Sequence, residues 1–159
     1  EKEIDHTHIL AVEISGLIRQ IVAGLKAQFD KKSLALHVLS HQKIMVQTDP
    51  YQLSQAIYNL LTNAYKFTES GGTVTVSYQM VGAELVITIQ DTGVGIALED
   101  QPRVFDAYYR GSNSLNVVGD GIGLYVVKEN LLKIGGSVEL ESTQGNGSRF
   151  TIKIPVNQQ

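Results

Sequence analysis

The sequence predicts a single α/β (α+β) domain, a two-layer sandwich in which helices cover one face of a mixed, largely antiparallel sheet. Three observations support this fold class. The 159 residues are 43% apolar, enough for one hydrophobic core. Apolar residues recur at helical spacing in long segments, and alternating strand-like segments follow one another mostly as adjacent hairpins.

Three segments carry helical signals. The first begins near Ile14, and a second should begin at Pro50, with Asp49 as its cap, and end near Phe67. A third is expected from about Gly121 to Lys133. The apolar stripe of the first helix consists of Leu17, Ile18, Ile21, Val22, Leu25 and Phe29.

Strand candidates fill much of the remaining chain, apart from an irregular stretch near residues 97–120. Apolar and polar residues alternate through residues 74–80 and 85–89, as expected of half-buried strands. The other candidates are residues 8–12, 34–39, 43–47, 138–140 and 150–154, with a turn at 145–147 between the last two.

Composition excludes several classes of protein. A net charge of −3 argues against a nucleic-acid partner, which would need a clustered basic surplus. The chain has no cysteine, which removes disulfides and thiolate metal sites. Its apolar runs are far shorter than the ~20 residues needed to span a bilayer, and its first residues are unlike a signal peptide. We therefore expect a cytoplasmic segment without direct membrane contact.

The second predicted helix has a polar side opposite its apolar stripe. Asn59, Asn63 and Lys66 fall together on it at i, i+4 and i+7. One interpretation is a solvated surface. The other is a ligand site, with amide oxygens for Mg²⁺ and an ammonium group for phosphate.

A carboxylate and two glycines follow the strand candidate 85–89. In the segment Asp91-Thr-Gly93-Val-Gly95-Ile96, the glycines would let the backbone approach a ligand closely. An ordinary turn is the alternative. The glycine spacing is not that of the Rossmann fingerprint.

A second glycine segment, Gly119-Asp-Gly121-Ile122-Gly123-Leu124, opens the third predicted helix. Free amides and the positive end of a helix dipole suit phosphates, although a flexible loop with a glycine cap is an alternative. No Walker-type phosphate loop and no protein-serine kinase signature occur in the chain.

An aromatic segment, Val104 to Arg110, lies between the two glycine segments. Phe105 suits a short helix packed on the core, and the Arg110 guanidinium could reach phosphate.

The order and spacing of these motifs resemble those of histidine kinases over nearly the whole chain. Residues 59–68 resemble the N box, 91–96 the first glycine box, 105–110 the F box and 119–124 the second glycine box. The ending, residues 136–155, is similar to the family's closing hairpin. This resemblance implies the gyrase, chaperone, histidine kinase and mismatch-repair (GHKL) fold, with ATP held between the helices and a mobile lid.

The resemblance also implies roles for individual residues. Asp91 would accept a hydrogen bond from the adenine amino group, Asn63 would hold Mg²⁺, and Asn59 and Lys66 would face the phosphates. Asn59 is a further possible Mg²⁺ ligand. The lid would span about residues 111–120 and hinge at the glycines of the second box. The remaining residues expected to line the ATP site are Gly93, Gly95, Ile96, Phe105, Tyr109, Arg110, Gly119, Gly121, Ile122, Gly123 and Leu124.

One position distinguishes functions within this superfamily. Members that hydrolyse ATP with water carry a glutamate general base where this chain has Asn59, and an amide cannot take that proton. A histidine acceptor brings its own nucleophilic nitrogen, so the sequence favours a histidine kinase of a two-component signal transduction system. The rivals are a serine-directed kinase or ATPase, and a degenerate module that only binds nucleotide or regulates a partner.

By the resemblance, the phospho-acceptor histidine is expected on a separate dimerisation domain, because only 62 residues precede Asn63, too few for the family's acceptor segment. His6 and His8 lie in no acceptor-like sequence, and His37 and His41 are expected to be plain surface or edge residues. We expect residues 1–7 to be the tail of an upstream linker and residues 8–159 to be the catalytic domain. This fragment should bind ATP without phosphorylating itself. Its expected partners are the missing dimerisation domain and a downstream response regulator. His6 and His8 are expected to lie at or beside the first strand. A metal site formed by these two histidines is a less favoured alternative.

Overall fold

The three α-helices of the described residues form one layer of the domain. The computed structural model describes residues 8–107, 109 and 123–156. Helix α1 spans Ile14–Lys31, α2 spans Pro50–Phe67 and α3 spans Gly123–Leu132. A short 3₁₀-helix, η1, spans Gln101–Arg103.

A five-stranded sheet in the order β2-β4-β5-β7-β6 forms the other layer. Its one parallel pair joins β2 to β4, and the other neighbours are antiparallel. This confirms the predicted two-layer fold with a mixed, largely antiparallel sheet. The strands are β2 (Ala35–Val38), β4 (Thr73–Val81), β5 (Glu84–Asp91), β6 (Ser137–Ser142) and β7 (Ser148–Pro155).

The first and third strand candidates pair with each other outside the main sheet. Strand β1 (Leu10–Glu13) runs antiparallel to β3 (Met45–Thr48), with Val12 opposite Val46. Both valines are buried against the core. Each of these strands begins two residues later and ends one residue later than the sequence predicts.

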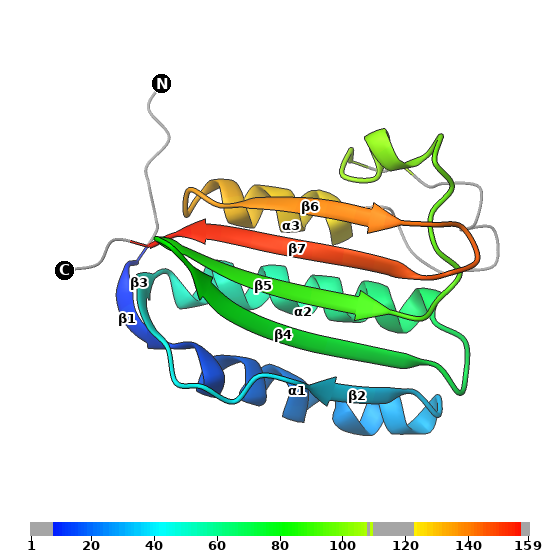
Figure 1. Cartoon of the computed structure of the whole chain (residues 1–159), viewed down its shortest axis with the longest axis horizontal. Helices are drawn as coiled ribbons and strands as arrows, with labels where there is room; N and C mark the ends of the chain where they lie inside the picture. The colour runs from blue at the N-terminus through cyan, green and yellow to red at the C-terminus, as the bar shows by residue number, and fades with distance from the viewer. Residues whose placement is uncertain (1–7, 108, 110–122, 157–159) are drawn as a thin grey trace.

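All three helices lie on one face of the sheet (Figure 1). The alternation of strand residues explains this arrangement, because Val74, Val76 and Tyr78 of β4 are buried while Thr73, Thr75 and Ser77 are half-buried on the other face. The helix stripes close the core from their side. Its largest fully buried side chains are Phe29, Phe150, Ile14, Ile18, Leu53, Ile57, Leu60, Leu61, Leu85, Ile87, Ile89 and Leu131.

Helix α2 begins where the sequence predicts. Asp49 accepts hydrogen bonds from the backbone amides of Tyr51 and Gln52, and Pro50 occupies the first turn, where no amide donor is needed. The other carboxylate oxygen of Asp49 accepts a 2.8 Å hydrogen bond from the amide of His8. The start of α2 is thus fixed to the chain that enters β1.

A buried polar contact joins α2 to α3. Asn130 Nδ2 donates a 2.7 Å hydrogen bond to Gln52 Oε1, and both residues are at least nine-tenths buried. Asn130 Oδ1 is also buried and has no hydrogen-bond partner within the part of the chain that the structure describes. This pair therefore fixes the two helices side by side within an otherwise apolar contact.

We predict that Gln52→Ala lowers the free energy of unfolding by about 1–3 kcal/mol, the cost of leaving a buried amide unpaired. Gln55→Ala on the same helix is the matched control and should change stability by less than about 0.5 kcal/mol. Replacing both Gln52 and Asn130 by leucine should recover most of the loss, because no buried amide then remains. Urea denaturation measures all three variants. Equal stability of the Gln52→Ala and Gln55→Ala variants would contradict this assignment.

The topology brings the ends of several helices and strands to one edge of the molecule. Strand β5, helix α2 and the β6–β7 turn all reach this edge, and α3 begins there (Figure 1). The irregular segment after β5 lies at the same edge. It contains η1 and continues through turns to Ala107. Most residues predicted to form the nucleotide site belong to these ends.

Candidate functional site

Asp91 is a buried carboxylate at the end of β5. The residue is 5% exposed, and its Oδ1 accepts a 2.8 Å hydrogen bond from the amide of Gly93. Burial raises the pKa of Asp91, and hydrogen bonds from the amides of Gly93 and Ser148 partly oppose that shift. Such a carboxylate costs stability unless a donor compensates it, which makes it a candidate ligand-binding group.

Three glycines allow the backbone to pass close to Asp91. A Cβ on Gly93 would lie 2.3 Å from the carbonyl oxygen of Phe67, at the end of α2. A Cβ on Gly95 would lie 2.2 Å from the carbonyl oxygen of Thr143, and one on Gly147 would lie 2.1 Å from that of Asp91. The first glycine segment is therefore more than an ordinary turn, since it is packed between α2 and the β6–β7 turn.

Backbone hydrogen bonds connect the same three segments. Val94 donates its amide to Phe67 O at 3.1 Å, and Gly145 donates to Val94 O at 2.7 Å. In register, Asp91 faces Ser148 across β5 and β7. The end of α2, the glycine segment and the closing hairpin thus form one connected unit around Asp91.

The three polar residues predicted on α2 lie on the side of the helix toward α3. Gln52, which binds Asn130 of α3, precedes Asn59 by seven residues, so the two share a helix flank. Asn59 and Asn63 are half-buried and Lys66 is exposed. The outward side instead carries Tyr51 and Tyr58, which are exposed.

The second glycine segment is described only in part. Gly123 and Leu124 form the first residues of α3 and are half-buried. The predicted residues Arg110, Gly119, Gly121 and Ile122, and the predicted lid at 111–120, lie outside the described residues.

Phe105 packs where the sequence predicts, against the core. Its ring meets that of Phe150 edge-on, with centroids 6.1 Å apart. The helical turn in this region is η1, which ends two residues before Phe105, while residues 104–107 form turns and a bend.

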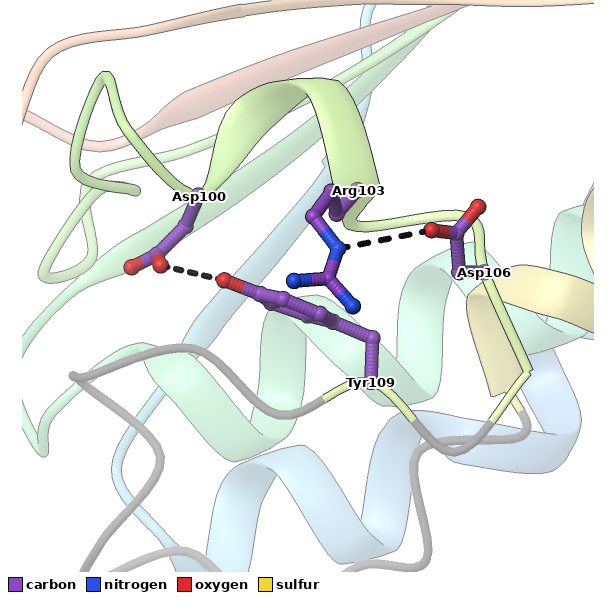
Figure 2. Close-up of polar contacts among 4 residues, drawn as sticks. All are labelled: Asp100, Arg103, Asp106 and Tyr109. Atoms are coloured by element: carbon purple, nitrogen blue, oxygen red, sulfur yellow. Dashed lines mark hydrogen bonds and ion pairs between the residues drawn. The ribbon is translucent and has the colours of Figure 1, made fainter.

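Tyr109 is tied to the segment that follows the first glycine box (Figure 2). Its hydroxyl donates a short hydrogen bond to the buried Asp100 carboxylate. The Arg103 guanidinium lies 4.8 Å from the Tyr109 ring centroid and also pairs with Asp106 at 3.7 Å. The hydrogen bond to Asp100, followed by burial and the charge of Asp100, raises the pKa of Tyr109. Sequence reasoning found Tyr109 but missed Asp100 and Arg103.

We predict that Tyr109→Phe lowers Tm by a few degrees at neutral pH and not at strongly alkaline pH. A raised pKa means that the folded state favours the protonated phenol, so this stabilisation is complete below the ordinary pKa of 10.0. It is lost as pH rises through the higher pKa of the folded protein. Thermal melts of wild type and variant across this range measure the difference. The same Tm difference at every pH would show that the ring, and not its hydroxyl, matters.

The described part of the chain has neither a metal-binding cluster of acidic, histidine or cysteine side chains nor a membrane-crossing helix. Residues 8–107, 109 and 123–156 contain no group of three or more His, Cys, Asp or Glu side chains that could hold a metal ion. Over the same residues, none of the helices has both the length and the apolar character needed to cross a bilayer. His8 is exposed, while His6 lies outside the described residues.

Comparison with known proteins identifies the family. A sequence profile described as histidine kinase-, DNA gyrase B-, and HSP90-like ATPase matches residues 48–158. The chain belongs to this family. Within this ATPase family it is similar to sensor histidine kinase RppB of Synechocystis, 32% identical over 146 residues that cover 87% of this chain and 32% of RppB. Sensor-like histidine kinase SenX3 of Mycobacterium tuberculosis is 31% identical over 146 residues, 91% of this chain and 36% of SenX3.

Solved structures agree with the sequence comparison. The mycobacterial sensor histidine kinase MprB matches with a TM-score of 0.79 and 25% identity, covering 96% of this chain and all of that one. Full-length ShkA, solved in complex with AMPPNP, matches with a TM-score of 0.85 and 26% identity over 97% of this chain and 32% of ShkA. The expected resemblance to histidine kinase catalytic domains is thus confirmed. The chain spans about a third of the length of the curated relatives.

Proposed function

We propose that this domain binds Mg-ATP and donates the γ-phosphoryl group to a histidine on a dimerisation domain of the same sensor kinase. The observation that carries this proposal is the environment of the Asp91 carboxylate. This buried carboxylate, enclosed by the glycine segment and the closing hairpin, accepts hydrogen bonds from two backbone amides and has no compensating charge among the described residues. A ligand donor such as the adenine amino group would complete its hydrogen bonding.

In this proposal the nucleotide lies between the first glycine segment and the inner flank of α2. Adenine binds at Asp91, beside Gly93, Gly95 and Ile96. The phosphates extend along α2 toward Asn59 and Lys66 and meet the start of α3 at Gly123 and Leu124. Backbone amides at a helix N-terminus favour phosphate oxygens.

The donor set on α2 fits a magnesium ion. Asn59 and Asn63 supply neutral amide oxygens from one half-buried helix flank. Mg²⁺ typically takes one or two protein oxygens together with phosphates and water, so a cluster of carboxylates is not required. When bound, the ion would neutralise phosphate charge, and Asn63 is the residue proposed to hold it, with Asn59 as a second ligand.

The chemistry suits a histidine acceptor. The imidazole nitrogen would attack the γ-phosphorus, a P–N bond would form, the bond to the bridging oxygen would break, and ADP would leave. Asn59 cannot remove a proton from an attacking water, which disfavours hydrolysis as a competing reaction. The chain's own residues contribute mainly by positioning the phosphates and by placing the Lys66 charge beside them.

Two protein partners follow from the proposed reaction: the domain that carries the acceptor histidine and the protein that next receives the phosphoryl group. The solved structure of ThkA in complex with the response regulator TrrA shows that the histidine kinase of that pair assembles with a regulator. We propose that this domain acts with its dimerisation domain and that a response regulator receives the phosphoryl group. We further propose that these reactions take place in the cytoplasm.

Labelled ATP tests the reaction. The domain alone should bind ATP and form almost no phosphoprotein, whereas a cognate histidine hairpin added in trans should acquire acid-labile phosphate. Asn63→Ala should remove the magnesium-dependent part of ATP binding, and Gln79→Ala on the exposed end of β4 is the control. Acid-stable phosphoserine would support the serine-directed alternative, and steady phosphate release would support an ATPase. Failure of the wild type to bind ATP would leave only a regulatory module.

A further inference from the structure

The side chain of Gln101, at the start of η1, bridges two segments of the nucleotide site. Its Nε2 donates to the carbonyl oxygen of Ile96 at 2.9 Å and to that of Ser142 at 3.0 Å. An amide nitrogen carries two hydrogens, so both are used by these two contacts. The residue thereby connects the last position of the first glycine segment to the end of β6.

Ser142 continues the connection through its hydroxyl. Ser142 Oγ accepts from the amide of Ile96 at 2.8 Å and donates to the carbonyl oxygen of Gly147 at 2.8 Å. It also lies 2.9 Å from Ser148 Oγ. Because its single hydrogen is used at Gly147, Ser148 must be the donor in that third contact.

These contacts form a clamp that holds both backbone polar groups of Ile96, its amide and its carbonyl. Its amide is held by Ser142 Oγ and its carbonyl by Gln101 Nε2. The far end of the same network reaches Gly147 and Ser148, which contact Asp91 through the backbone. The clamp therefore fixes the glycine segment against the hairpin that encloses the Asp91 carboxylate.

We propose that Gln101 is a positioning residue that sets nucleotide affinity by fastening residues 93–96 to the β6–β7 hairpin. The inference rests on the proposed function, since it concerns the adenine end of the same site. Gln101 does not need to touch the nucleotide. Its two N–H donors hold the backbone in the conformation that presents Asp91. Less conformational entropy is therefore lost when adenine binds.

Three substitutions of Gln101 separate hydrogen bonding from size. Gln101→Met keeps the length of the side chain and removes both donors, so ATP affinity measured by calorimetry should fall about tenfold. Gln101→Glu should lower ATP affinity at least as much, because it places a carboxylate next to two carbonyl oxygens. Gln101→Lys regains donors and should restore affinity to within about threefold of wild type. Gln79→Glu, exposed on β4, controls for the added charge.

Two further measurements distinguish positioning from a general loss of structure. ADP affinity should fall by the same factor as ATP affinity, because the clamp lies at the adenine end. With the histidine hairpin present, KM for ATP should rise while kcat stays within about twofold of wild type. Unchanged affinity in Gln101→Met, or a loss that Gln101→Lys does not restore, would overturn the inference while wild-type binding still upheld the proposed function. Absence of ATP binding by the wild type would instead overturn both.

Discussion

Asp91→Asn should weaken ATP binding about 10- to 150-fold. The estimate is the ~1.5–3 kcal/mol typical of a hydrogen bond to a charged group. Asparagine can keep accepting from the Gly93 amide through its oxygen. Its NH₂ group would then replace the acceptor that faces the ligand, so two donors would oppose each other. Calorimetric titration with ATP measures the loss.

The same substitution should raise Tm at neutral pH. The fold raises the pKa of Asp91 above its ordinary value of 3.8, mainly by burial, so the folded state prefers the protonated acid. That contribution is complete below the ordinary pKa and is lost as pH rises through the higher pKa of the folded state. At neutral pH the cost of the buried charge is fully present, and asparagine removes it.

A matched substitution tests both effects. Asp30→Asn changes an exposed carboxylate on α1 and should leave ATP affinity unchanged within about twofold. The Tm gain of Asp91→Asn should shrink toward zero in acid. Lower stability of Asp91→Asn at neutral pH would mean that its hydrogen bonds outweigh the cost of burial.

Gly147→Ala should destabilise the domain by about 2–5 kcal/mol. Its φ is +84°, a conformation that costs an L-residue about 1–2 kcal/mol. The added Cβ would also lie 2.1 Å from the carbonyl oxygen of Asp91, a backbone atom that cannot turn aside. Overpacking of this kind typically adds about 1–3 kcal/mol. Urea denaturation gives the total.

Gly145→Ala separates the two contributions to this loss. Gly145 lies in the same turn with a φ of +89°, and a Cβ there would meet no atom within 4 Å. The control should therefore lose only the conformational part, about 1–2 kcal/mol. Equal losses at Gly145 and Gly147 would argue against the close approach to Asp91.

The sequence was most informative where local physical chemistry decides the structure. The cap at Asp49, the proline after it and the apolar stripe of α2 predicted that helix to within a residue. Alternation likewise predicted β4 and β5, which pair through a short turn. The carboxylate at Asp91 was recognised from its position after a strand and before two glycines.

Contacts between distant segments could not be predicted from spacing. Gln101 lies in none of the recognised motifs, and Ser142 belongs to the closing hairpin without a predicted role. Only the folded chain brings both residues to Ile96. The Asp100 carboxylate that holds Tyr109 resembles an ordinary solvated acid in a charged stretch, since nothing local indicates that it is buried. The hydrogen bond between Gln52 and Asn130 of α3 could not be predicted either, because it depends on how the two helices align.

The strand order has a consequence for when the site comes into being. Strands β4 and β5 are joined by a tight turn, so their pairing closes a small loop and can form early. Asp91 pairs with Ser148 only when β7 docks on β5, which requires closing the much longer loop between these two strands. During refolding we expect the amides of β4 and β5 to gain protection from hydrogen exchange before those of β7. A newly made chain would then be unable to recognise nucleotide until β7 is in place.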